Sequence, residues 1–186
     1  MENKNILNSN TVSHHNKLTE VVNLPYRVYE SFKGKYFMGH TPFLILERNL
    51  NAWGGLMNPE DSEVKLYINT FTVSNTSNTP FRSELWLNSE PLGRTSISPY
   101  VSPANTTIYP LPTSDILLGF AQHVKHSPSS GISLFNRIAE ANSTVVGNYY
   151  GKIVIPPGGS LIVYLHSPGS QHIKTDVALG WWEEPL

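Results

Sequence analysis

The stretch that decides the fold runs from residue 151 to residue 167 and reads Gly-Lys-Ile-Val-Ile-Pro-Pro-Gly-Gly-Ser-Leu-Ile-Val-Tyr-Leu-His-Ser. Its two runs of branched and aromatic residues, Ile153–Ile155 and Leu161–Leu165, are typical of β-strands. Proline has no amide hydrogen for a sheet ladder, and glycine adopts backbone angles that other residues avoid. The segment Pro156–Gly159 therefore ends one strand and starts another, and we interpret it as one corner of a β-sandwich.

The clearest strand pattern lies upstream, in Val64–Asn75. Leu66 and Ile68 would face one side of a sheet, whereas Phe71 would face the other, which predicts a bulge or a crossing between two environments. A polar turn rich in Asn and Ser follows, and Phe81–Asn88 then alternates again. We predict that these two segments pair as a hairpin.

The rest of the chain consists mostly of short β-like runs between turn residues. Only Ile132–Ala141 is compatible with a helical turn. The pattern predicts an all-β fold: an antiparallel, jelly-roll-like β-sandwich of about eight to nine strands. Residues 1–24 are polar and would form a flexible N-terminal arm ahead of the sandwich domain, residues 25–186. The further predicted strands are Tyr26–Phe32, Lys35–Met38, Phe43–Glu47, Thr106–Tyr109, Ile116–Phe120, Val145–Ile155, Leu161–Ser167 and Ile173–Trp182.

The charge content is low. Charged residues make up 15% of the chain, against about 25% in ordinary soluble domains, and the net charge is −1. No basic field is present to attract nucleic acid. A surface with few charges favours a subunit that copies of itself partly cover, but a soluble domain that is simply rich in Asn, Ser and Thr explains the composition equally well.

Composition also limits chemistry and location. The chain has no cysteine, which excludes disulfides, thiolate metal sites and a cysteine nucleophile. It has no run of about 18 apolar residues that could span a membrane. Met1–Asn8 lacks the apolar segment of a signal peptide, so we expect synthesis in the cytoplasm without signal-peptide-dependent secretion.

No motif points to catalysis. The chain has no Gly-x-Ser-x-Gly elbow, no phosphate-binding glycine loop and no His-Glu-x-x-His. His123 and His126 have the spacing of two metal ligands, but no third ligand lies near them in the sequence. Four carboxylates could meet in space as an acid–base pair, although the pattern does not require it. We expect no enzyme activity, no metal and no cofactor; the four carboxylates are Glu47, Glu84, Asp115 and Asp176.

Aromatic residues are the stronger theme. Trp53, Trp86, Trp181 and Trp182 are candidates for an interface or for a ligand site. Because adjacent residues of a strand face opposite sides, either Trp181 or Trp182 needs a cover outside the core. The arm, a partner subunit or a ligand such as a glycan could provide it, and we favour a protein over a sugar.

Three segments carry a family resemblance: Tyr36-Phe-Met-Gly-His-Thr-Pro42, Asn51–Pro59, and Val64–Trp86 with its core Phe71-Thr-Val-Ser-Asn75. They resemble an uncharacterised family of small β-proteins from spore-forming bacteria. The layout is also similar to the subunits of endospore appendage fibres, jelly rolls made in the mother cell without a signal peptide. That likeness implies an N-terminal connector that docks into a neighbouring subunit and a final location on a spore or cell surface. The chain lacks the cysteines with which several such subunits crosslink.

The leading hypothesis is a non-enzymatic structural subunit that self-assembles into a fibre, appendage or surface layer. Its arm would pair with an exposed strand edge of a neighbour and place aliphatic side chains in pockets. The partners would be copies of the chain itself, without nucleic acid or membrane. The alternative is a carbohydrate-binding or adhesive module that uses exposed Trp and Tyr rings. The aliphatic residues of the arm are Ile6, Leu7, Val12, Leu18, Val21 and Val22.

Overall fold

The computed structural model describes residues 21–169 and 172–186, which form one helix and twelve strands. The helix in this part of the chain is not long and apolar enough to cross a bilayer. In chain order the elements are α1 (Tyr26–Phe32), β1 (Tyr36–His40), β2 (Leu44–Leu46), β3 (Asn51–Met57), β4 (Val64–Asn75), β5 (Phe81–Leu87), β6 (Ser96–Ile97), β7 (Val101–Pro103), β8 (Leu117–Val124), β9 (Ile132–Ala139), β10 (Ser143–Ile155), β11 (Ser160–Leu165) and β12 (Ile173–Pro185).

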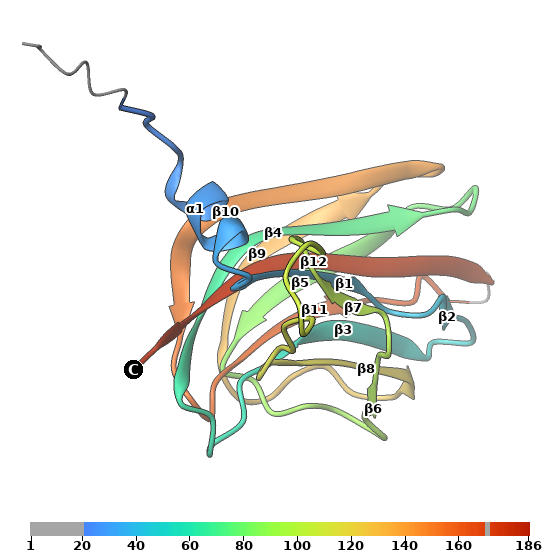
Figure 1. Cartoon of the computed structure of the whole chain (residues 1–186). Helices are drawn as coiled ribbons and strands as arrows, with labels where there is room; N and C mark the ends of the chain where they lie inside the picture. Colours follow the sequence, from blue (N-terminus) through green and yellow to red (C-terminus); the bar gives the residue numbers. More distant parts are fainter. Residues whose placement is uncertain (1–20, 170–171) are drawn as a thin grey trace, which may run out of the picture.

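Two antiparallel sheets pack face to face (Figure 1). Sheet I has the order β10-β4-β12-β1-β7, with β2 also paired to β12, and sheet II has the order β6-β8-β3-β11-β5-β9. Early strands lie between late ones in both sheets, which is the double Greek-key order of a jelly roll. The structure therefore confirms the predicted all-β sandwich. The insertion between β5 and β9 adds the short strands β6 and β7 and the longer β8.

The turn at Pro156–Gly159 is a corner, as predicted. It separates β10 in sheet I from β11 in sheet II, so the chain changes sheets there. The predicted hairpin is wrong, because β4 pairs with β10 and β12 in sheet I, whereas β5 pairs with β11 and β9 in sheet II. A five-residue link fits a hairpin or a crossing between sheets equally well, and alternation does not identify a strand's partner.

The predicted irregularity within β4 is a β-bulge at Asn69. Thr70 pairs with Gly180 and Ile68 pairs with Trp181, which leaves Asn69 without an opposite residue on β12. The extra residue reverses the side on which the strand's residues are buried, so Ile68 and Phe71 both reach the core.

The segment Tyr26–Phe32 is a helix, not the predicted strand. Pro25 precedes it, and its carbonyl accepts hydrogen bonds from the amides of Val28 at 2.8 Å and Tyr29 at 3.2 Å. The helix ends at Phe32, and Gly34, two residues later, has a φ of 74° that allows the amide of Lys35 to donate back to the Glu30 carbonyl at 2.9 Å. Tyr26, Tyr29 and Phe32 follow one another at intervals of three residues, which places them near one face of a helix. All three side chains are 48–63% exposed, as expected for a helix on the surface.

Two further predictions need correction. The helical turn predicted within Ile132–Ala141 is wrong, because Ile132–Ala139 forms strand β9 and its pairing with β5 outweighs its weak local preference. Thr106–Tyr109 is not a strand. The side chain of Asn105 there accepts hydrogen bonds from the amide and hydroxyl of Thr107, and this local turn replaces sheet pairing.

The hydrophobic core has two parts. The larger lies between the sheets and includes Phe37, Phe71 and Trp181. The smaller lies on the outer face of sheet II, where Trp53 and Tyr164 pack under the loop that carries Leu92. The part of this face around β3 and β11 is therefore covered by connecting segments, which bury Trp53 and Tyr164.

Candidate functional site

The adjacent residues Trp181 and Trp182 divide between the core and the outer face of sheet I, as alternation predicts. Trp181 is fully buried between the sheets, and Trp182 faces outward yet is only 4% exposed. Its cover is internal: Tyr67 stacks on it at 5.2 Å between ring centroids, and Tyr26 of α1 meets its ring edge at 6.3 Å. The helix that follows the N-terminal arm is thus docked on sheet I.

The chain leaves this helix toward solvent. Val21 and Val22 are 84% and 68% exposed, and Figure 1 shows the blue segment before α1 leading away from the sandwich. The other aliphatic residues predicted to act in docking lie outside the described residues; they are Ile6, Leu7, Val12 and Leu18. α1 is therefore the point at which the arm attaches to the body.

Trp53 and Trp86 both belong to the outer face of sheet II. Trp53 is fully buried, and its Nε1 donates to the Leu92 carbonyl at 2.7 Å. Trp86 is half-buried, and its Nε1 donates to Oε2 of Glu84 at 2.8 Å. Trp53 and Trp181 thus have no surface to offer a ligand, because each fills the interior that it helps to form.

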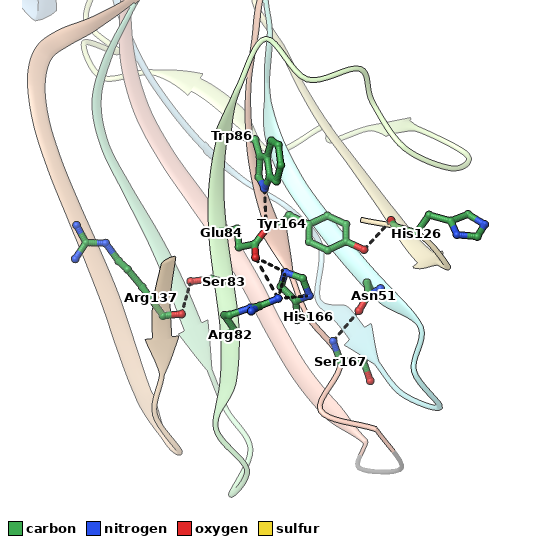
Figure 2. Close-up of polar contacts among 10 residues, drawn as sticks. All are labelled: Asn51, Arg82, Ser83, Glu84, Trp86, His126, Arg137, Tyr164, His166 and Ser167. Atoms are coloured by element: carbon green, nitrogen blue, oxygen red, sulfur yellow. Dashed lines mark hydrogen bonds and ion pairs between the residues drawn. The ribbon is translucent and has the colours of Figure 1, made fainter. Parts of the chain in front are cut away.

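A polar cluster lies beside Trp86 (Figure 2). The side chains of Arg82, Glu84 and His166 point toward one another, and Oε1 of Glu84 lies 3.2 Å from Nη2 of Arg82 and 2.9 Å from Nε2 of His166. Burial lowers the pKa of His166, although the neighbouring Glu84 carboxylate opposes that shift. Both carboxylate oxygens of Glu84 already have partners, so the cluster joins β5 to the end of β11 and offers no free acid or base.

Of the four carboxylates considered as an acid–base pair, Glu84 and Asp176 do not meet. Glu84 lies on the outer face of sheet II, whereas Asp176 lies on β12 in sheet I with its side chain on that sheet's outer face. Within residues 21–169 and 172–186, no group of three His, Cys, Asp or Glu side chains is placed to hold a metal ion. The absence of enzyme activity stays a prediction.

One long side of the sandwich is open. β9 ends sheet II and β10 ends sheet I, and in the described part of the chain each has a strand neighbour on one side only. The two strands are eight and thirteen residues long and lie beside each other. Six large apolar side chains there are 42–65% exposed: Ile132, Phe135, Ile138, Val146, Tyr150 and Val154. We call these two strands the open edge.

The sequence predicts a strand at Val145–Ile155 but does not show where that strand lies in a sheet. Only the strand order places it at the margin, so the open edge could not be identified from the sequence. Inside the margin, Phe71, Tyr149 and Phe135 stack in a row, with ring centroids 6.0 Å apart at each step. This row closes the core, so apart from Phe135 the exposed apolar residues of the open edge are not needed to complete the interior.

The fold and its surfaces define an all-β sandwich with an appended N-terminal segment and an unpaired edge. A family model matches residues 8–186, and the chain belongs to this family, the family of unknown function DUF6143. No curated protein and no solved structure matches the chain.

Proposed function

We propose that this protein is a non-enzymatic structural subunit that self-assembles into a fibre, an appendage or a surface layer. The N-terminal arm of one copy docks on the sandwich of the next. The observation that carries the proposal is the open edge, where two long strands and six exposed apolar side chains lie together at the margin of both sheets.

Unpaired strand edges bind other strands because their outward amides and carbonyls have no partner in the sheet. An extended segment can add to such an edge through main-chain hydrogen bonds, while alternate side chains fill pockets. The arm supplies scattered aliphatic residues, its two acidic and two basic side chains balance in charge, and its first 20 residues can extend over about 70 Å. That length is sufficient to reach an adjacent molecule.

The assembly would be head-to-tail, because an arm and an edge are different surfaces. Contacts of this type form rings if the rotation between copies closes and open filaments if it does not. Low net charge adds little repulsion between copies. The resemblance to endospore appendage subunits supports a location on a spore or cell surface.

Two variants test the role of the arm. The first lacks residues 1–24, and the second keeps the full length but replaces the six aliphatic arm residues with serine. We expect the full chain to form large assemblies in light scattering and electron microscopy, and we expect both variants to remain small because they lack the docking side chains. Both retain α1 and the sandwich, so their circular dichroism should match that of the parent.

Two results would overturn the proposal. One is a parent chain that stays monomeric at every concentration tested. The other is assembly that both variants reproduce with the same size and shape.

A further inference from the structure

The outer face of sheet I carries two hollows that share a wall. Their volumes are about 520 and 380 Å³, and His40 and Tyr100 line both. The two rings are parallel within 1° and lie 4.8 Å apart between centroids. They therefore form a ridge with one hollow on each side.

The ridge is held in place by backbone contacts. The His40 amide donates to the Tyr100 carbonyl at 3.1 Å, and the Ser98 hydroxyl donates to the His40 carbonyl at 2.6 Å. Nδ1 of His40 is 2.8 Å from the Thr41 carbonyl, which directs that nitrogen to the backbone. A ligand would thus meet a wall that is already formed, which reduces the entropy lost on binding.

The larger hollow is apolar, and residues with small side chains form its base. Ala178, Gly180 and two threonines form the floor, and Met38 and Val101 rise beside it. A Cβ at Gly180 would lie 2.7 Å from the Tyr36 hydroxyl, so glycine at this position allows Tyr36 to pack against the strand beside the hollow. No Asp, Glu, Lys or Arg belongs to the lining. The chemistry of this hollow suits an aliphatic chain and not an ion.

The smaller hollow differs in having one carboxylate. Asp176 lines it together with Phe43 and Tyr100, both of which are about half-exposed. Within residues 21–169 and 172–186, no hydrogen bond or ion pair reaches the Asp176 side chain. Burial raises the pKa of Asp176, and the charge of His40 opposes this. A desolvated carboxylate of this kind favours a cation as its partner.

An ammonium group already lies at the border of this hollow. Nζ of Lys174 is 3.8 Å from the centroid of the Phe43 ring, which is the geometry of a cation–π contact. The lysine does not form an ion pair with Asp176. Lys174 therefore already occupies the Phe43 ring, whereas the Asp176 carboxylate and the Tyr100 ring remain for a cation that enters from solvent.

We infer that these two hollows form a binding site for an organic ammonium ion that carries an aliphatic chain. The ammonium group lies against Asp176 and the ring of Tyr100, and the chain crosses the ridge into the apolar hollow. Anions are excluded by Asp176, and a neutral chain would leave its carboxylate without a partner. This site is distinct from the open edge and does not depend on self-assembly. The ammonium group could belong to a free alkylamine or to a lysine side chain of a peptide.

Matched probes test the inference: n-hexylammonium, n-hexanol and n-hexanoate, titrated against the full chain at pH 7 and followed by NMR. We expect hexylammonium to bind at least about tenfold more tightly than hexanol, which is about 1.4 kcal/mol, and hexanoate to bind least. Nα-acetyl-lysine methylamide distinguishes the sources, because a peptide site binds it more tightly than hexylammonium and an alkylamine site binds it less tightly.

Three variants connect the probes to the residues. Asp176→Asn should reduce hexylammonium affinity to that of hexanol and leave hexanol unchanged, whereas Ala178→Leu, which fills the floor, should weaken both. Asp61→Asn, an exposed carboxylate elsewhere, is the control and should change neither. The inference is overturned if hexanol and hexylammonium bind equally, or if Asp176→Asn has no more effect than Asp61→Asn. It is also overturned if none of the probes binds at a roughly 10-fold molar excess over protein at about 1 mM.

Discussion

The two long sides of the sandwich end in different ways. On one side the sheets end in β6 and β7, which are two and three residues long and belong to a segment with five prolines. On the other side they end in β9 and β10, which are eight and thirteen residues long and expose branched and aromatic side chains. Short strands and prolines prevent pairing with other chains, and long apolar edges permit it. We call the side with the short strands the protected side and the side with the long strands the open side.

Glu183 connects the protected side to the core. Its carboxylate accepts hydrogen bonds from the Asp115 amide at 3.0 Å and from Nε1 of Trp181 at 2.9 Å, and the Ser114 hydroxyl also donates to it. Ser114 and Asp115 belong to the insertion that supplies β6 and β7. On the open side the equivalent role falls to stacked rings. Hydrogen bonds to Glu183 thus close the core on the protected side, and stacked aromatic rings close it on the open side.

The largest expected effect is on the aromatic packing of the open side. Phe71→Ala should lower the free energy of unfolding by about 3–5 kcal/mol, because it leaves a cavity beneath Tyr149. Urea unfolding followed by tryptophan fluorescence measures this change. The outer residue Phe135 stacks on the same ring but is 42% exposed, so Phe135→Ala is the matched control and should cost clearly less. Equal losses would show that the row does not close the core.

The next effect is the pH dependence of the protected side. Burial raises the pKa of Glu183 above the ordinary glutamate value of 4.5, so the folded state holds its proton more tightly than the unfolded state. The resulting stability is fully present below pH 4.5 and is lost as the pH rises through the folded pKa.

Replacement by glutamine removes that titration. As the pH rises above 4.5, Glu183→Gln should gain stability relative to the parent by up to about 1.4 kcal/mol per pH unit, with no further gain once the parent is fully ionised. Urea unfolding at several pH values measures the difference. Glu60→Gln, at an exposed loop position, serves as the control. A difference between Glu183→Gln and the parent that is constant with pH would contradict the assignment.

The smallest effect on stability is expected from two exposed substitutions, one on each side of the sandwich, which are compared by their effect on assembly. Ile138→Lys on β9 and Ile97→Lys on β6 change exposed positions, 63% and 49% accessible, so each should alter the free energy of unfolding by less than about 0.5 kcal/mol. Assembly should respond differently. We expect Ile138→Lys to reduce the assembled fraction in sedimentation, because lysine on an edge opposes pairing, and we expect Ile97→Lys to leave it unchanged. Equal behaviour of the two variants would remove the distinction between the sides.

Much of the fold could be predicted because it depends on local chemistry. The Pro156–Gly159 corner follows from the backbone limits of proline and glycine, and the bulge at Asn69 follows from the change in alternation along β4. The division of Trp181 and Trp182 between core and exterior follows from the geometry of a strand. Each of these features is decided within a few residues.

Other features depend on contacts between distant residues and could not be predicted. The partners of β4 are β10 and β12, which follow it much later in the chain, and no local pattern distinguishes these pairings from a hairpin with β5. The helical state of Tyr26–Phe32 is stabilised where Tyr26 packs on Trp182. The burial of Trp53 depends on a loop near Leu92 that folds over it.

The sequence by itself determined an all-β chain, its corners and its bulge, and the absence of cysteine chemistry, because backbone limits and alternation act on neighbouring residues. Only the tertiary structure decided which strands lie at the margins and which tryptophans are covered. It also decided that His40, Tyr100 and Asp176 line one hollow. Those properties depend on the order of strands across each sheet, and that order is set by the packing of residues far apart in the chain.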